Sequence, residues 1–145
     1  MAEIGKDAGR TLHWAEGLET GVAEIDADHR LLIDRSNALL YAVEKEHPKT
    51  AIMAIVSRMV AECREHFRRE DSVLQAGQYG GAKEHAAEHR RIEGELDQAI
   101  DAIGGSGDLV NQWKSFALAF QALLIEHFLR YDLKYKSHLL WERGR

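Results

Sequence analysis

The sequence has very few of the residues that cross-link or interrupt a chain. Its 145 residues include one cysteine, Cys63, so a disulfide cannot form within the chain, which suits a reducing compartment. Pro48 is the only proline, so helices can run for long stretches without being broken. A chain of this length with 45% hydrophobic residues can bury one core, and we expect a single domain over residues 1–145.

Positive charge and long apolar runs are also scarce. The formal net charge is -5, which argues against a nucleic-acid surface, because affinity for phosphates depends on clustered Lys and Arg. We find no stretch that is apolar enough to span a membrane. The first residues, MAEIGKDAGRTLHWAEG, are polar and lack the apolar centre of a secretory signal. We therefore expect a cytoplasmic protein without a nucleic-acid or membrane partner.

The hydrophobic pattern predicts helices. Turn-forming residues are concentrated at 46–50, 76–83 and 104–108, and apolar residues recur between them every three or four positions. Period-two alternation, which would indicate strands, is missing. Short connections make neighbouring helices antiparallel, so the predicted fold is all-α, an up-down-up-down four-helix bundle. Residues 1–22, with Trp14 and Leu18, are expected to pack outside as an arm, and the helices to span about 24–45, 49–76, 82–103 and 108–138.

Several histidines occur at helical spacing from another histidine or a carboxylate. In HFRRE, His66 lies four residues before Glu70, and in HAAEH, His85 lies four residues before His89. Four residues advance a helix by about 400°, so each pair projects from nearly one face. This spacing is suited to metal chelation. A single pair is only moderately specific, because an ordinary solvated helix pair has the same spacing.

The last helix contains a pair with a less regular spacing. In HFLRYD, His127 and Asp132 are five residues apart and diverge by about 140° in an ideal helix. Convergence of the two side chains needs a π-bulge, a long carboxylate reach or a local break between Phe128 and Tyr131. The sequence leaves these three routes open.

The helix register brings the separate motifs to one level. In an antiparallel bundle, the starts of the first and third helices lie level with the ends of the second and fourth. Histidine alone on an apolar face is more often a core residue than a ligand, but here seven groups share one layer and point inward, where an unpaired polar group is costly. Five imidazoles and two carboxylates are more ligands than one tetrahedral zinc ion binds. They suit two six-coordinate ions that share bridging carboxylates. The predicted ligands are His29, His66, Glu70, His85, His89, His127 and Asp132.

The remaining candidates are interpreted as structural. His13, His47 and His138 fall in the arm, a loop and the tail, away from the predicted layer. Cys63 is expected to be a small buried residue. The basic residues in "RRE" (68–70) and "HRR" (89–91) are expected to face solvent.

Together these motifs resemble the hemerythrin family, in particular its bacterial branch, the bacteriohemerythrins, which are non-haem di-iron proteins that bind oxygen. The likeness runs from Trp14 to Tyr135 and includes "IDADH" (25–29) with the three motifs above, in the family's order. The resemblance implies that Glu70 and Asp132 bridge two iron ions, which also share an oxo or hydroxo bridge. It implies further that one iron is bound by His85, His89 and His127, and the other by His29 and His66.

The same resemblance implies a function. The iron with two histidines keeps an open position where dioxygen binds, for storage, delivery or sensing, and the expected partners are dioxygen with an oxygen-consuming enzyme or a signalling domain. Relatives often carry tryptophan where this chain has Leu123, so access to the pocket differs. The residues expected to line the oxygen pocket are Ile25, Leu32, Phe67 and Leu123.

The sequence also allows functions other than oxygen binding. A di-iron enzyme acting on peroxide, nitric oxide or dioxygen is the main alternative, but no candidate acid or base stands apart from the ligands, so we expect that the protein is not an enzyme. A ferritin-like site would use Glu-x-x-His and more carboxylates, whereas this set is rich in histidine. An interaction bundle without metal is the least favoured alternative.

Overall fold

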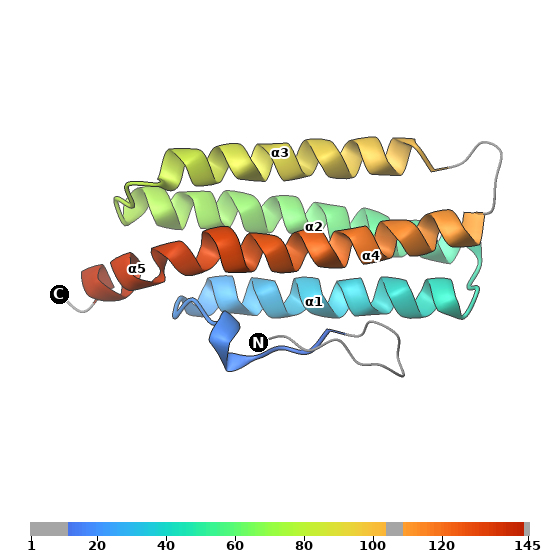
Figure 1. The fold of residues 1–145 in the computed structure, drawn as a ribbon, viewed down its shortest axis with the longest axis horizontal. Coiled ribbons are helices and arrows are strands. Elements are labelled where there is room, and N and C mark those ends of the chain that lie inside the picture. Colours follow the sequence, from blue (N-terminus) through green and yellow to red (C-terminus); the bar gives the residue numbers. More distant parts are fainter. Residues whose placement is uncertain (1–11, 104–108, 144–145) are drawn as a thin grey trace.

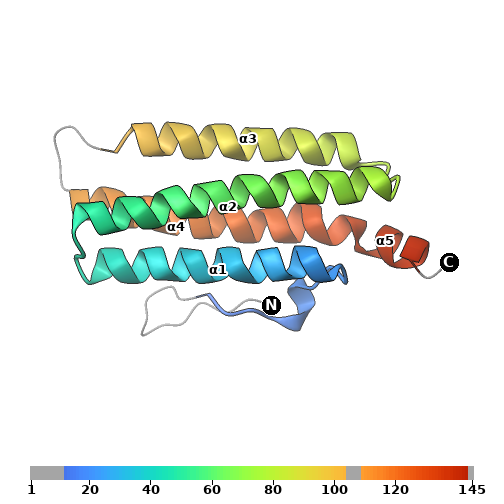
Figure 2. The ribbon, with the colours of Figure 1, turned by 180° about the vertical axis from the view of Figure 1, so that it is seen from behind.

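The computed structural model describes residues 12–103 and 109–143, and it is an all-α four-helix bundle, as predicted (Figures 1 and 2). Long helices form because Ala, Leu, Glu and Arg favour helix and because each amphipathic face is covered by its neighbours. No strand occurs within the described ranges. The four bundle helices are α1 (Ala23–Glu44), α2 (Lys49–Ala76), α3 (Ala82–Asp101) and α4 (Leu109–His127).

The first three predicted helices are close to the observed ones, with ends that differ by two residues at most. The last predicted helix, 108–138, is interrupted after His127, in the region where the sequence left a π-bulge or a local break open. After α4 the chain forms a π-helical segment, Phe128–Asp132, then a 3₁₀ turn, Leu133–Tyr135, and then α5, Lys136–Arg143.

The bundle is held chiefly by contacts of α1 with α2 and α4, and of α3 with α2. The helix α5 continues the line of α4 beyond the end of the bundle (Figure 1). There it packs against the turn between α2 and α3, where His138 Nε2 donates a hydrogen bond of 2.7 Å to the carbonyl of Gly77. A Cβ added at Gly77 would lie 2.7 Å from Leu139 Cδ2, so glycine permits this close approach. The contact fixes the chain after the π-helical segment.

The start of α1 is fixed by Asp26. Its carboxylate accepts hydrogen bonds from the backbone of Thr20 at 2.8 Å, the hydroxyl of Thr20 at 2.9 Å and the backbone of Gly21 at 3.1 Å. These bonds tie the chain that precedes α1 to the first turn of the helix. They also hold α1 in place one turn before His29.

The described part of the predicted arm lies along α1 (Figure 1). Leu12 exchanges two backbone hydrogen bonds of 2.8 Å with the side-chain amide of Asn37. Trp14 lies under the guanidinium of Arg30, 4.8 Å from the ring centroid, while Leu18 is buried. Residues 1–11 of the predicted arm lie outside the described residues.

The core is formed by the apolar residues that recur every three or four positions along the helices. Cys63 is buried among them, as expected, and burial raises the pKa of its thiol to about 12. Among the helices of the described ranges, none combines the length and the apolar character that crossing a membrane would need.

Candidate metal centre

All seven predicted ligands lie in one buried layer of the bundle, and none is more than 3% exposed. Their ligand atoms form two overlapping sets, and within each set they lie within 4.8 Å of one another. The three-histidine half consists of His85, His89 and His127 with Glu70 and Asp132. The two-histidine half consists of His29 and His66 with the same two carboxylates.

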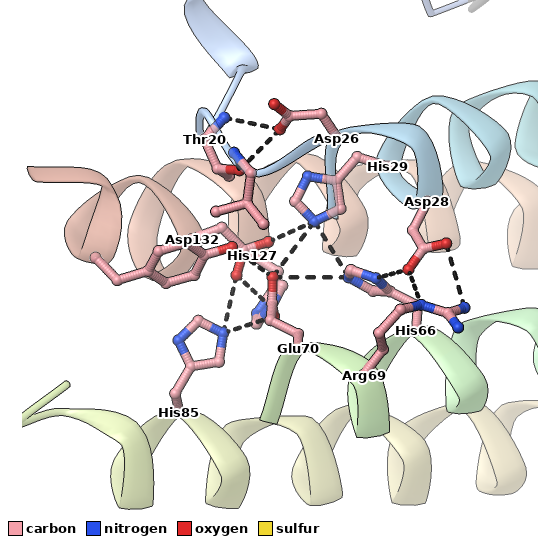
Figure 3. A network of polar contacts seen from close by, with 12 residues as sticks. Thr20, Asp26, Asp28, His29, His66, Arg69, Glu70, His85, His127 and Asp132 are labelled. Atoms are coloured by element: carbon pink, nitrogen blue, oxygen red, sulfur yellow. Dashed lines mark hydrogen bonds and ion pairs between the residues drawn. The ribbon is translucent and has the colours of Figure 1, made fainter. Parts of the chain in front are cut away.

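The two carboxylates each direct one oxygen to each half (Figure 3). On the three-histidine side, Glu70 Oε1 lies 2.9 Å from Nε2 of both His85 and His89, and Asp132 Oδ1 lies 2.9 Å from His85 Nε2. On the other side, His29 Nε2 lies 3.1 Å from Asp132 Oδ2 and 3.6 Å from Glu70 Oε2. This is the arrangement that two carboxylates need to bridge two cations.

The π-helical segment explains how Asp132 reaches the centre. Helix α4 ends at His127, and the following five residues form the π-helix. A π-turn contains one residue more than an α-turn, so a spacing of five brings Asp132 back to the side of His127. Its Oδ1 lies 3.0 Å from His127 Nε2. The π-bulge, one of the three routes considered from the sequence, is therefore the one used.

This geometry predicts that deletion of Leu129 is tolerated. Leu129 lies in the π-helical segment and is 47% exposed, so its removal would leave an α-helical spacing of four between His127 and Asp132. We expect the deletion variant to bind two cations per chain, as measured by titration of the metal-free protein with Co²⁺.

The matched control deletes Ala122, which is also exposed but lies within the α-helical part of α4. Removing it would rotate His127 by about 100° relative to the start of α4 and abolish the centre. If both deletions gave the same loss of cation binding, the π-helical segment would not be the reason that Asp132 converges.

The two buried carboxylates favour positive charge on the groups around them. Burial lowers the histidine pKa values, but the two carboxylates outweigh it and raise them to about 9 for His29 and His85 and to about 10 for His127. Burial raises the pKa values of Glu70 and Asp132, yet the surrounding histidines hold both well below their usual range. The carboxylates thus remain ionised and attract cations.

The nitrogen atoms that face the centre fit metal ions. Asp28 and Asp71 accept hydrogen bonds from Nδ1 of His66 and His89, so the Nε2 atoms of these two rings carry lone pairs. Each Nε2 faces another imidazole nitrogen, 3.1 Å from His29 Nε2 for His66 and 3.2 Å from His127 Nε2 for His89. Both oxygens of Asp132 are buried, and their short contacts with Nε2 of His29, His85 and His127 lack hydrogen-bond geometry. Two cations would satisfy these lone pairs and oxygens together.

Reasoning from the sequence missed several residues around the centre. Tyr135 is buried and donates a hydrogen bond of 2.7 Å to Glu70 Oε2, and burial raises the pKa of its hydroxyl, which keeps it a donor. The only sequence signal for Tyr135 is its position three residues after Asp132. Arg69 and Arg90 are half exposed but do not simply face solvent, because they pair with Asp28 and Asp71.

The predicted lining of the oxygen pocket is distributed over different parts of the core. Leu32 and Phe67 belong to the main cluster, and the ring of Phe67 stacks on His89 with centroids 4.1 Å apart. Ile25 belongs to a second cluster with Tyr135. Leu123 is half buried on the side of α3, where it lines a shallow groove. The role of these four residues in binding oxygen stays a prediction.

The sequence matches one known family model. The model for the hemerythrin HHE cation-binding domain covers residues 20–139, which include the whole layer of candidate ligands. A comparison with curated proteins gave no match.

Proposed function

The chain belongs to the hemerythrin family, and from this premise we propose that it holds two iron ions and binds dioxygen reversibly between its helices. The observation that carries the proposal is the unequal division of five imidazoles around two shared carboxylates. With a solvent-derived bridge, the three-histidine half offers six ligands and the two-histidine half five. One position at the two-histidine half then stays open to a small ligand.

The protein's own contribution is to hold the metal ligands in place and to exclude water from them. When two ferrous ions are bound, they would supply the two electrons that dioxygen takes up on binding and gives back on release. Phe128 stacks on His29 with centroids 4.0 Å apart, and Phe67 covers His89, so aromatic rings lie against both halves. Burial of the ligands keeps bulk water from a reaction that has to run in both directions.

The polar groups beside the ligands favour reversible oxygen binding over an enzymatic reaction. The hydroxyl of Tyr135 is engaged with Glu70, and Asp28 and Asp71 are engaged with histidines. These three side chains are therefore not free to act as acid or base toward a substrate. The proposed role is oxygen storage, delivery or sensing.

The test is oxygen addition after anaerobic loading with Fe²⁺. We expect a coloured adduct that disappears when oxygen is removed under vacuum and returns over repeated cycles, followed by visible absorption. Protein loaded with Zn²⁺ is the control and is expected to show no change in absorption. Irreversible bleaching with release of hydrogen peroxide would instead support an enzyme of the oxidase type, and no spectral response would contradict oxygen binding.

A further inference from the structure

Two of the five ligand imidazoles are held by a carboxylate from the neighbouring helix. The carboxylate of Asp28 on α1 faces the ring of His66 on α2 (Figure 3), and it lies 3.0 Å from Nδ1. Asp71 of α2 lies 2.7 Å from Nδ1 of His89 on α3. His66 belongs to the two-histidine half and His89 to the three-histidine half, so each half contains one carboxylate-held ring.

Two of the three other ligand rings, those of His29 and His127, do not share this support. Nδ1 of His29 and Nδ1 of His127 are buried without a hydrogen-bond partner. A carboxylate on Nδ1 is therefore not a general property of this layer.

Each of the two aspartates is itself held by an arginine. Arg69 Nε donates a hydrogen bond of 2.8 Å to Asp28 Oδ2. The second pair is looser, because Arg90 Nη2 lies 3.4 Å from Asp71 Oδ2 while Arg90 Nε pairs with Glu93 at 2.9 Å. The arginine comes from the helix of the histidine in both cases, so each aspartate is held by two groups of that helix. Arg69 is 46% exposed, which places the outer end of its pair at the protein surface.

We infer that Asp28 with Arg69, and Asp71 with Arg90, are two independent positioning pairs that each set the cation affinity of one half of the centre. A carboxylate that accepts the Nδ1 proton fixes the tautomer and the orientation of the ring and strengthens Nε2 as a ligand. Because the pairs act on His66 and His89 separately, they tune the two halves separately. The inference rests on the cation centre of the proposed function and does not require dioxygen.

The experiment titrates metal-free protein with Co²⁺ alone and resolves the two binding steps by calorimetry and visible absorption. The variants are Asp28→Asn and Asp71→Asn, which keep the side-chain size and remove the charge. We expect Asp71→Asn to weaken the tighter step, at the three-histidine half, by about 10–100-fold, and Asp28→Asn to weaken the other step by about 10–100-fold. The absorption bands of the affected Co²⁺ should shift, which a general loss of stability would not produce.

Two further variants make the test specific. Asp97 forms an ion pair with Arg64 at 2.7 Å, also between α2 and α3 but without a histidine, so Asp97→Asn is the matched control and should leave both steps unchanged. Arg69→Gln changes only the exposed end of one pair and should cause a smaller loss in the same step as Asp28→Asn. This surface variant keeps the inference testable if Asp28→Asn fails to fold.

The inference is overturned if Asp28→Asn and Asp71→Asn bind Co²⁺ like Asp97→Asn, or if each weakens both steps equally. It is also overturned if Arg69→Gln affects the other step. Failure of reversible oxygen binding would leave the Co²⁺ result intact, so the two proposals fail separately.

Discussion

Replacing Glu70 with glutamine is expected to weaken the binding of both cations by about a hundredfold to several thousandfold. Glu70 supplies one oxygen to each half, with Oε1 2.9 Å from His85 Nε2 and Oε2 3.6 Å from His29 Nε2. Glutamine has one carbonyl oxygen, and its NH₂ group cannot act as a ligand toward the second cation. Removing one partner of a buried charge pair costs about 3–5 kcal/mol, and about 1.4 kcal/mol corresponds to tenfold in affinity.

The measurement is the number of Co²⁺ or Fe²⁺ ions retained per chain after dialysis, with affinities from titration. The matched control is Glu62→Gln, because Glu62 lies on the same helix and is paired with Arg35 and Arg58 away from the centre. Glu62→Gln should retain two ions. If Glu70→Gln bound both ions with the affinities of the unchanged protein, Glu70 would not bridge the two halves.

The ligand layer could be predicted from the sequence because it depends on backbone periodicity. The spacing of four in His66 and Glu70, and in His85 and His89, fixes which helix face each pair shares. The antiparallel register then fixes the level of each motif along the bundle. Asp132 was the exception, because its spacing of five left three routes open, and only the structure shows the π-helical segment.

The supporting residues could not be predicted, because they depend on side-chain reach between helices. Asp28 directly precedes His29 in the sequence, and it holds His66 on another helix. Glu88 likewise directly precedes His89, yet it pairs with Arg91 on its own helix at 3.0 Å. Sequence position beside a ligand is the same in both cases, so it does not distinguish a supporting carboxylate from a surface ion pair.

Metal binding is expected to produce the largest change in stability. A ligand that binds only the folded state adds about 4 kcal/mol when its free concentration is a thousand times its Kd, so two sites add about 8 kcal/mol. For a chain of this length each kcal/mol raises Tm by about 3–4 °C, which gives a total rise of about 24–32 °C. The physical reason is that the histidines and carboxylates converge only in the folded bundle, so the unfolded chain offers no comparable site.

The measurement compares thermal unfolding of the metal-free protein with that of protein saturated with Co²⁺ or, without oxygen, Fe²⁺. Mg²⁺ at the same concentration is the control for ionic strength, because it prefers oxygen ligands and should raise Tm little at a centre with five imidazoles. Tm should continue to rise with the logarithm of the free Co²⁺ concentration above saturation, and Glu70→Gln should show a much smaller rise. Equal Tm values in Co²⁺ and Mg²⁺ would mean that the buried layer does not bind transition-metal ions, since two ions bound only by the folded chain must stabilise it.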